Sequence, residues 1–112
     1  MKKLLGGLLI ALLIACSDAN NKSQFELKEN AQIGIAFENN LSYSDDFNVY
    51  KYRNYYNGGG VALGDINNDG WVDVYFTANQ SENKLYINQG DFTFKDITAT
   101  AGVAGQRAWS TG

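Results

Sequence analysis

Four short runs between residues 61 and 97 alternate apolar with polar side chains, and this pattern constrains the fold more than any other feature. The runs cover residues 61–63, 72–77, 84–88 and 92–97. Strict period two with β-branched and aromatic residues is typical of half-buried strands. Clusters of Asn, Gly, Asp, Gln, Ser and Glu separate the runs, and most of these residues favour chain reversal; they lie at 57–60, 67–70, 79–83 and 88–91. The sequence therefore predicts a four-stranded antiparallel meander.

Two segments before the meander also have strand character. Ile33, Ile35 and Phe37 alternate with smaller or polar residues, and residues 49–53 are rich in aromatic side chains. No segment after the first sixteen residues has a convincing helical period. We therefore expect an all-β fold.

A repeat begins in the chain without being completed. Asn57-Gly-Gly-Gly60 leads into the first strand of the meander, and Trp109-Ser-Thr-Gly112 looks like the same lead-in about 50 residues later. Four strands at a period near 50 suit a blade of a β-propeller. Because one blade cannot close a ring and leaves strand edges uncovered, we expect a segment of a longer protein or one that depends on partner copies.

The first sixteen residues have the pattern of a processed export signal. Lys2 and Lys3 precede an apolar core, Leu4 to Ala15, that is shorter than the roughly 20 residues needed to span a bilayer. Leu13-Ile14-Ala15-Cys16 resembles the bacterial lipobox, which predicts a signal peptide at 1–15 and a lipid on Cys16. An ordinary signal peptide with an incidental Cys is the alternative. Residues 16–30 are polar and read as a lipidated tether to a folded segment at 31–112.

The charge and the missing residue types exclude several functions. Without Lys2 and Lys3, 7 basic and 12 acidic residues remain, a net charge of −5 that argues against nucleic acid and electrostatic membrane binding. The chain has no His, so Ser-His-Asp, Cys-His and zinc-hydrolase mechanisms lack a complete set of parts. We expect a protein that is not an enzyme and that meets the membrane through its lipid. The outer membrane of a bacterial envelope is the expected location, with its face left open.

The stretch Gly64-Asp-Ile-Asn-Asn-Asp-Gly-Trp-Val-Asp73 has oxygen-bearing residues at alternate positions. If Asp65 is position one, the spacing is that of a calcium loop, with Gly70 at the sharp bend at position six. The expected Ca²⁺ ligands are the side chains of Asp65, Asn67, Asp69 and Asp73 and the backbone carbonyl of Trp71. Position twelve is Phe76, so the loop is not an EF-hand. A turn rich in Asx residues, without an ion, is the alternative.

These residues also carry a family resemblance. Residues 58–79, with Asn83-Lys-Leu-Tyr-Ile-Asn-Gln-Gly90 and 92–103, resemble the FG-GAP/VCBS repeat of bacterial lipoproteins similar to cartilage acidic protein, which are often associated with an ASPIC/UnbV domain. The resemblance implies a seven-bladed propeller like the integrin α head. It also implies calcium in the loop that joins the first two strands of a blade, with the five ligands named above.

Three other features carry less information. Asn57-Gly58-Gly59-Gly60 lacks the Lys-Ser/Thr and the helix of a phosphate-binding loop, so a strand lead-in is favoured. A group of tyrosines is favoured as packing over a sugar-stacking platform: Tyr43, Tyr50, Tyr52, Tyr55 and Tyr56. Asp45 and Asp46 are adjacent, so a solvated loop is favoured over a catalytic pair.

These observations favour a calcium-stabilised propeller segment on a bacterial envelope that binds a protein or glycan. The first alternative is an accessory domain of a polysaccharide-acting enzyme whose chemistry lies beyond residue 112. The second is a purely structural piece whose calcium rigidifies the sheet.

Overall fold

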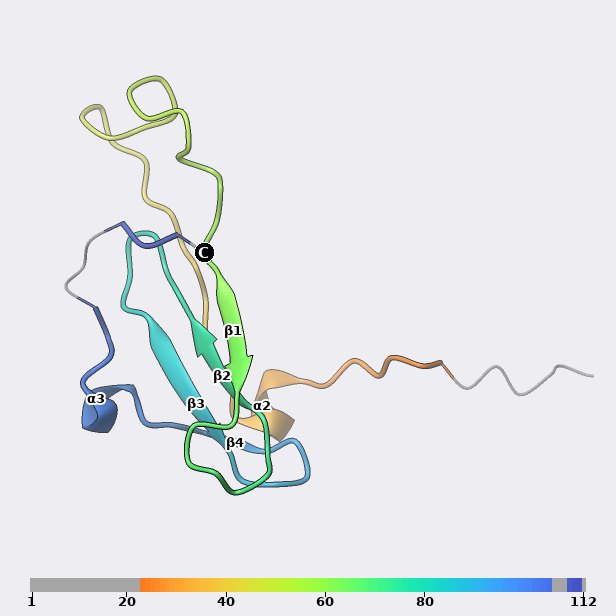
Figure 1. The fold of residues 1–112 in the computed structure, drawn as a ribbon. Coiled ribbons are helices and arrows are strands. Elements are labelled where there is room, and N and C mark those ends of the chain that lie inside the picture. Colours follow the sequence, from red (N-terminus) through yellow and green to blue (C-terminus); the bar gives the residue numbers. More distant parts are fainter. Residues whose placement is uncertain (1–22, 106–108, 112) are drawn as a thin grey trace, which may run out of the picture.

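The fold is a single four-stranded antiparallel sheet with loops at both ends (Figure 1). The computed structural model describes residues 23–105 and 109–111. The strands are β1 (Val61–Gly64), β2 (Asp73–Phe76), β3 (Lys84–Asn88) and β4 (Phe94–Asp96). Each strand pairs with the next in sequence, in the order β1-β2-β3-β4. The predicted meander and the all-β class are confirmed.

The structure corrects three local predictions. Ile33 ends a short helix, α2 (Asn30–Ile33), and the rest of the alternating segment forms no strand. Residues 49–53 lie in turns rather than in a strand. A second one-turn helix, α3 (Thr98–Ala101), follows β4, so helix is present where the sequence indicated no helical period.

Local hydrogen bonds explain why these segments leave the extended conformation. The side chain of Gln32 accepts a hydrogen bond from the backbone N–H of Glu29 at 3.1 Å, and Gly34 ends α2 with a φ of 77°. Both are ordinary helix-end signals. In the second segment, the buried side-chain amide of Asn48 forms hydrogen bonds with backbone groups that precede and follow it in the chain. These hydrogen bonds stabilise turns rather than a strand.

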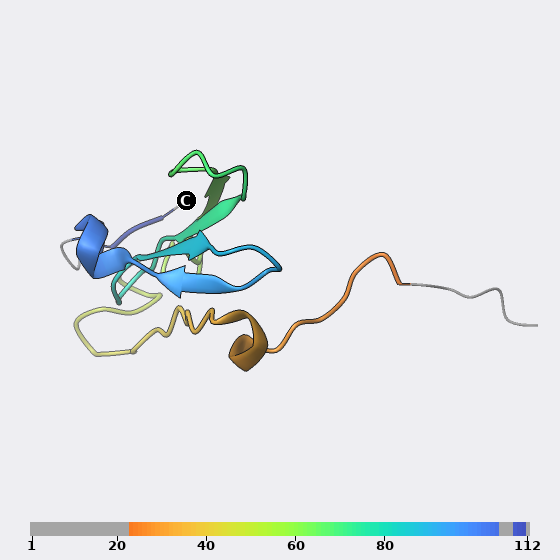
Figure 2. The same ribbon diagram turned by 90° about the horizontal axis from the view of Figure 1, so that it is seen from below.

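One face of the sheet is covered by the chain that precedes it. Paired residues in an antiparallel ladder share a face, so Val74 and Tyr86 lie on the same side, together with Phe76. Phe76 stacks on Phe37, with ring centroids 4.6 Å apart, and meets Tyr86 edge-on. Figure 2 shows the 34–40 segment running along this face. Aromatic packing therefore replaces strand pairing for residues near Phe37.

The other face packs against the segment after β4. Leu85 and its partner Tyr75 lie on this face. The Tyr75 hydroxyl donates to the carbonyl of Val103 at 2.9 Å, and the Leu85 N–H donates to the Thr98 hydroxyl at 2.9 Å. These bonds hold α3 against β3.

The β1 edge remains open among the described residues. All four residues of β1 are exposed, including Val61 at 63% and Leu63 at 70%. The strand pairs with β2 alone. The segment 23–29 also has no helix or strand, and extends away from the sheet with Phe25 and Leu27 exposed (Figure 1).

Candidate functional site

The predicted ion-binding residues lie in the loop that joins β1 to β2, at one end of the sheet (Figure 1). The strand β1 ends at Gly64 and β2 begins at Asp73. Gly70 has a φ of 89° and Asn68 a φ of 60°, both in the left-handed region where Gly and Asn are favoured. The sharp bend that the sequence predicted at Gly70 is confirmed.

Side-chain oxygens fold this loop around their own backbone. The Asp65 carboxylate accepts hydrogen bonds from the N–H groups of Asp69 and Gly70, at 3.1 and 2.9 Å. Asp69 accepts one from the N–H of Trp71 at 2.8 Å and another from the Asn67 amide at 2.8 Å. The loop therefore brings Asp65, Asn67 and Asp69 together at an exposed position.

Asp73 is placed differently from the other predicted ligands. Its side chain is 1% exposed, and its two oxygens accept the N–H groups of Ile66 and Asn88, at 2.9 and 2.8 Å. None of the ion pairs of the described residues includes Asp73. Within the described part of the chain, only backbone N–H groups hold this buried carboxylate.

Asn88 links the loop to the next turn, a role that the sequence alone did not reveal. Its amide donates to the carbonyl of Val72 at 3.1 Å and accepts the N–H of Gly90 at 3.0 Å. The indole of Trp71, which is half exposed, lies beside Gly90. The signal available in sequence was the Asn-Gln-Gly order at the end of a strand, which is typical of a side-chain-stabilised turn.

The oxygen atoms of the loop are of the kinds that bind a hard cation. Carboxylate, amide and carbonyl oxygens are the ligands of Ca²⁺ in proteins. Among the residues that the structure describes, no three His, Cys, Asp or Glu side chains form a group that could hold a metal ion. Cys16, the predicted lipidation site, lies outside the described residues.

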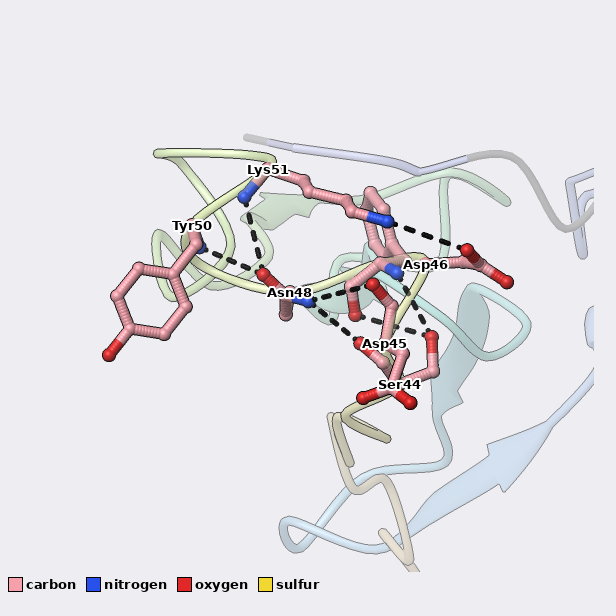
Figure 3. A network of polar contacts seen from close by, with 7 residues as sticks. Ser44, Asp45, Asp46, Asn48, Tyr50 and Lys51 are labelled. Atoms are coloured by element: carbon pink, nitrogen blue, oxygen red, sulfur yellow. Dashed lines mark hydrogen bonds and ion pairs between the residues drawn. The ribbon is translucent and has the colours of Figure 1, made fainter.

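The other residues singled out from the sequence lie at the opposite end of the sheet, beyond the start of β1. Asp45 and Asp46 are exposed, and Asp46 pairs with Lys51 at 3.4 Å (Figure 3). Asn48 organises this loop: its amide donates to the carbonyls of Ser44 and Asp45 and accepts the N–H groups of Tyr50 and Lys51. Tyr43, Tyr50 and Tyr56 are exposed, whereas Tyr55 is buried.

One interior contact connects the two lead-in segments that the sequence identified. The buried amide of Asn79 donates to the carbonyl of Gly58 at 2.8 Å and to that of Ser110 at 2.9 Å. Gly58 and Ser110 occupy the same position in Asn57-Gly-Gly-Gly60 and Trp109-Ser-Thr-Gly112. The two predicted lead-in segments therefore meet at a single side chain.

The described fold is that of a sheet repeat consistent with one blade of a β-propeller. Within this class, residues 65–112 match the FG-GAP-like repeat. The match begins at Asp65, the first residue of the loop described above. The repeat suggests a propeller-type binding or adhesion module. No curated protein and no solved structure matches the chain.

The structure contains no helix, among the residues it describes, with the length and apolarity required to cross a membrane.

Proposed function

We propose that the chain is a calcium-binding, envelope-anchored segment of a β-propeller that binds a protein or glycan and catalyses no reaction. The observation that carries the proposal is the loop from Asp65 to Asp73 at the start of an FG-GAP-like repeat. Its spacing and its oxygen donors suit Ca²⁺. The proposed relatives are bacterial lipoproteins similar to cartilage acidic protein.

The buried state of Asp73 supports a cation in this loop. Buried charges in proteins are as a rule paired with an opposite charge or bound to a metal, and Asp73 has two hydrogen bonds but no ion pair among the described residues. Two more carboxylates, those of Asp65 and Asp69, lie in the same loop. A bound cation would reduce the repulsion among the three.

The hydrogen bonds of the loop are compatible with an ion. Each carboxylate oxygen has about two lone pairs, and one N–H bond uses one of them. Asp65, Asn67, Asp69, Asp73 and the carbonyl of Trp71 would hold the calcium. The ion would neutralise charge and rigidify the loop, and the residues of the chain would supply the binding surface.

The anchor is proposed from the N-terminal sequence. Cleavage before Cys16 would leave a lipidated Cys, followed by a polar segment. The exposed, irregular conformation of residues 23–29 suits a tether between lipid and sheet. The outer membrane is the proposed location.

Calcium-dependent binding by the lipidated chain tests this function. The full chain is immobilised in detergent and exposed to detergent extracts of the envelope of the producing cells, with Ca²⁺ or with EGTA. We expect specific envelope components to be retained only with Ca²⁺. Asp69→Asn should abolish the retention, and Asp45→Asn, which changes an exposed carboxylate in another loop, should not.

Two results would contradict the proposal. Retention that is equal in Ca²⁺ and EGTA would remove the role of the ion. A hydrolytic activity that disappears when a residue of this segment is changed would remove the non-enzymatic role. Replacing Cys16 by Ser tests the anchor separately, because the variant should leave the membrane fraction.

A further inference from the structure

A surface cavity lies at the end of the sheet opposite the candidate calcium loop. Its volume is about 450 Å³, within the range of about 300 to 1,000 Å³ that is usual for ligand pockets. It is lined by Tyr52, Asn54, Asn57, Gly58, Gly59 and Thr111. None of these side chains carries a charge, whereas Glu38, Glu82 and Lys84 line the larger cavity beside Phe37. The uncharged lining favours a neutral ligand.

Tyr52 gives this cavity a rigid aromatic wall. Its ring stacks on Phe47, with centroids 5.7 Å apart and planes 19° apart. The ring of Trp109 meets Tyr52 edge-on at 5.3 Å. Tyr52 is half-buried, so part of its ring remains accessible. A ring that is fixed before binding loses little conformational entropy when a ligand stacks on it.

Hydrogen-bonding groups that the fold does not use surround the aromatic wall. Asn54 and Asn57 are exposed, and their side-chain amides make no hydrogen bond to any described residue. Each amide offers two donors and an acceptor. Gly59, which also lines the cavity, leaves no room for a side chain, because a Cβ there would lie 1.8 Å from the carbonyl oxygen of Thr77. The cavity thus combines an apolar surface with free polar groups.

Two buried donors of the aromatic cluster that holds Tyr52 also lack hydrogen-bond partners among the described residues. The hydroxyl of Tyr55 and the indole N–H of Trp109 are buried without a hydrogen bond to any described residue, and Tyr55 is 1% exposed. Tyr55 and Trp109 lie in the same aromatic cluster as Tyr52, with their centroids 5.7 Å apart. Unpaired buried polar groups are rare in folded proteins and call for an explanation such as a bound polar molecule.

We propose that this cavity binds a neutral glycan. The ring of Tyr52 would stack on the C–H face of a sugar, and the amides of Asn54 and Asn57 and the hydroxyl of Thr111 would bond its hydroxyl groups. The site rests on the proposed function, because it selects a glycan over a protein as the ligand.

Titration calorimetry of the full chain with defined oligosaccharides tests the site. The probes are cellohexaose, xylohexaose, mannohexaose and chitohexaose, each at millimolar concentration, with oligogalacturonate as an acidic comparison. We expect at least one neutral probe to bind and the acidic one to bind more weakly. Asn54→Ala should weaken that binding about fivefold and leave the melting temperature unchanged, because its side chain supports no contact of the fold.

Two variants of Tyr52 distinguish the contribution of its ring to glycan binding from that of its hydroxyl. Tyr52→Phe should retain the affinity within about twofold, and Tyr52→Ala should lower it more than about tenfold. Tyr50→Ala is the matched control, because Tyr50 is 89% exposed and lies outside the cavity. If Tyr52→Ala does not fold, Asn54→Ala still decides the question.

The outcomes distinguish this site from the general function. Oligosaccharide binding that is unaffected by Asn54→Ala, and equal in Tyr50→Ala and Tyr52→Ala, would place a glycan site elsewhere and overturn the inference alone. No binding of any neutral probe, together with calcium-dependent retention of an envelope protein, would also overturn the inference and leave the function standing. Failure of both assays would overturn both.

Discussion

The carboxylate of Asp73 accepts a hydrogen bond from the backbone N–H of Asn88 at 2.8 Å, which ties the end of the β1–β2 loop to the end of β3. The other oxygen of Asp73 accepts the N–H of Ile66 at 2.9 Å. One buried side chain therefore holds two loops at the same end of the sheet.

Replacing Asp73 by Asn should destabilise the fold by about 1–3 kcal/mol, because one buried N–H loses its acceptor and meets an amide donor instead. Urea unfolding of the full chain, followed by circular dichroism, measures the change. Asp45→Asn serves as control and should stay within about 0.5 kcal/mol of the original chain. Equal midpoints for the two variants would show that Asp73 has no such role.

Replacing Asn79 by Ala should cost about 2–4 kcal/mol and release the segment around Trp109. The buried side-chain amide of Asn79 forms hydrogen bonds with Gly58, Ser110 and Asn39. In the variant, the groups that now bond this amide would lose these hydrogen bonds. In a Trp71→Phe background, Trp109 is the only tryptophan, and its emission should shift to the red. An unshifted emission spectrum in the folded variant would contradict the proposed link.

Two glycines, Gly59 before β1 and Gly64 at its end, should respond in opposite ways to substitution by Ala. Gly59→Ala should destabilise the fold by about 1–3 kcal/mol or more, since the new Cβ would collide with the carbonyl oxygen of Thr77. Gly64→Ala meets no atom within 4 Å and should be neutral or stabilising by about 0.4–1 kcal/mol. Thermal melts of both variants measure the contrast, and similar melting temperatures would argue against this packing.

The pair Lys84–Asp96 predicts a pH dependence at the acid end. Burial alone would raise the pKa of Asp96, but hydrogen bonds from Thr98 and Lys84 outweigh this effect and hold the pKa below its usual range. A carboxyl with a lowered pKa in the folded state stabilises the fold above its unfolded pKa, and loses this effect as the pH falls through the folded pKa. The hydrogen bond to Asp96 raises the pKa of Lys84. Lys84 therefore stabilises the fold below its unfolded pKa and loses this effect as the pH rises through its folded pKa.

Urea midpoints at pH 7 and pH 3 should reveal this dependence. Asp96→Asn should be less stable than the original chain at pH 7, by at most about 1 kcal/mol because both side chains are about one-third exposed or more. The difference should shrink at pH 3. If the two chains differ in stability by the same amount at pH 7 and pH 3, the charge of Asp96 contributes nothing to the stability of the fold.

The sequence predicted the meander well because its strands follow a period of two between turn-forming clusters. The bounds of β3 match the predicted run, whereas β4 is shorter because Asp91 and Phe92 take positive φ values of 50° and 56° in the turn. Aromatic residues are common in strands, and this is why the sequence predicted a strand from Phe92 onward. A positive φ is unusual for Phe, and the sequence pattern did not reveal it.

The segment before the meander was harder to predict because tertiary and side-chain contacts decide its conformation. Phe37 alternates with polar neighbours as a strand residue would, and it packs on Phe76 without pairing. Similarly, the spacing of Asp73 identified it as a possible ligand but did not reveal its burial. Its partners Ile66 and Asn88 become neighbours only when the sheet forms.

Calcium titration of the full chain by isothermal calorimetry tests the central claim most directly. Extracellular modules bind with dissociation constants of roughly 10⁻⁴ to 10⁻³ M, so we expect one site in this range. Binding should also raise the melting temperature. Asp69→Asn, which keeps an acceptor for the N–H of Trp71, should abolish both effects, and Asp45→Asn should retain them. The absence of a calcium heat and of a shift in melting temperature would reduce the Asp65–Asp73 loop to a turn stabilised by its own hydrogen bonds.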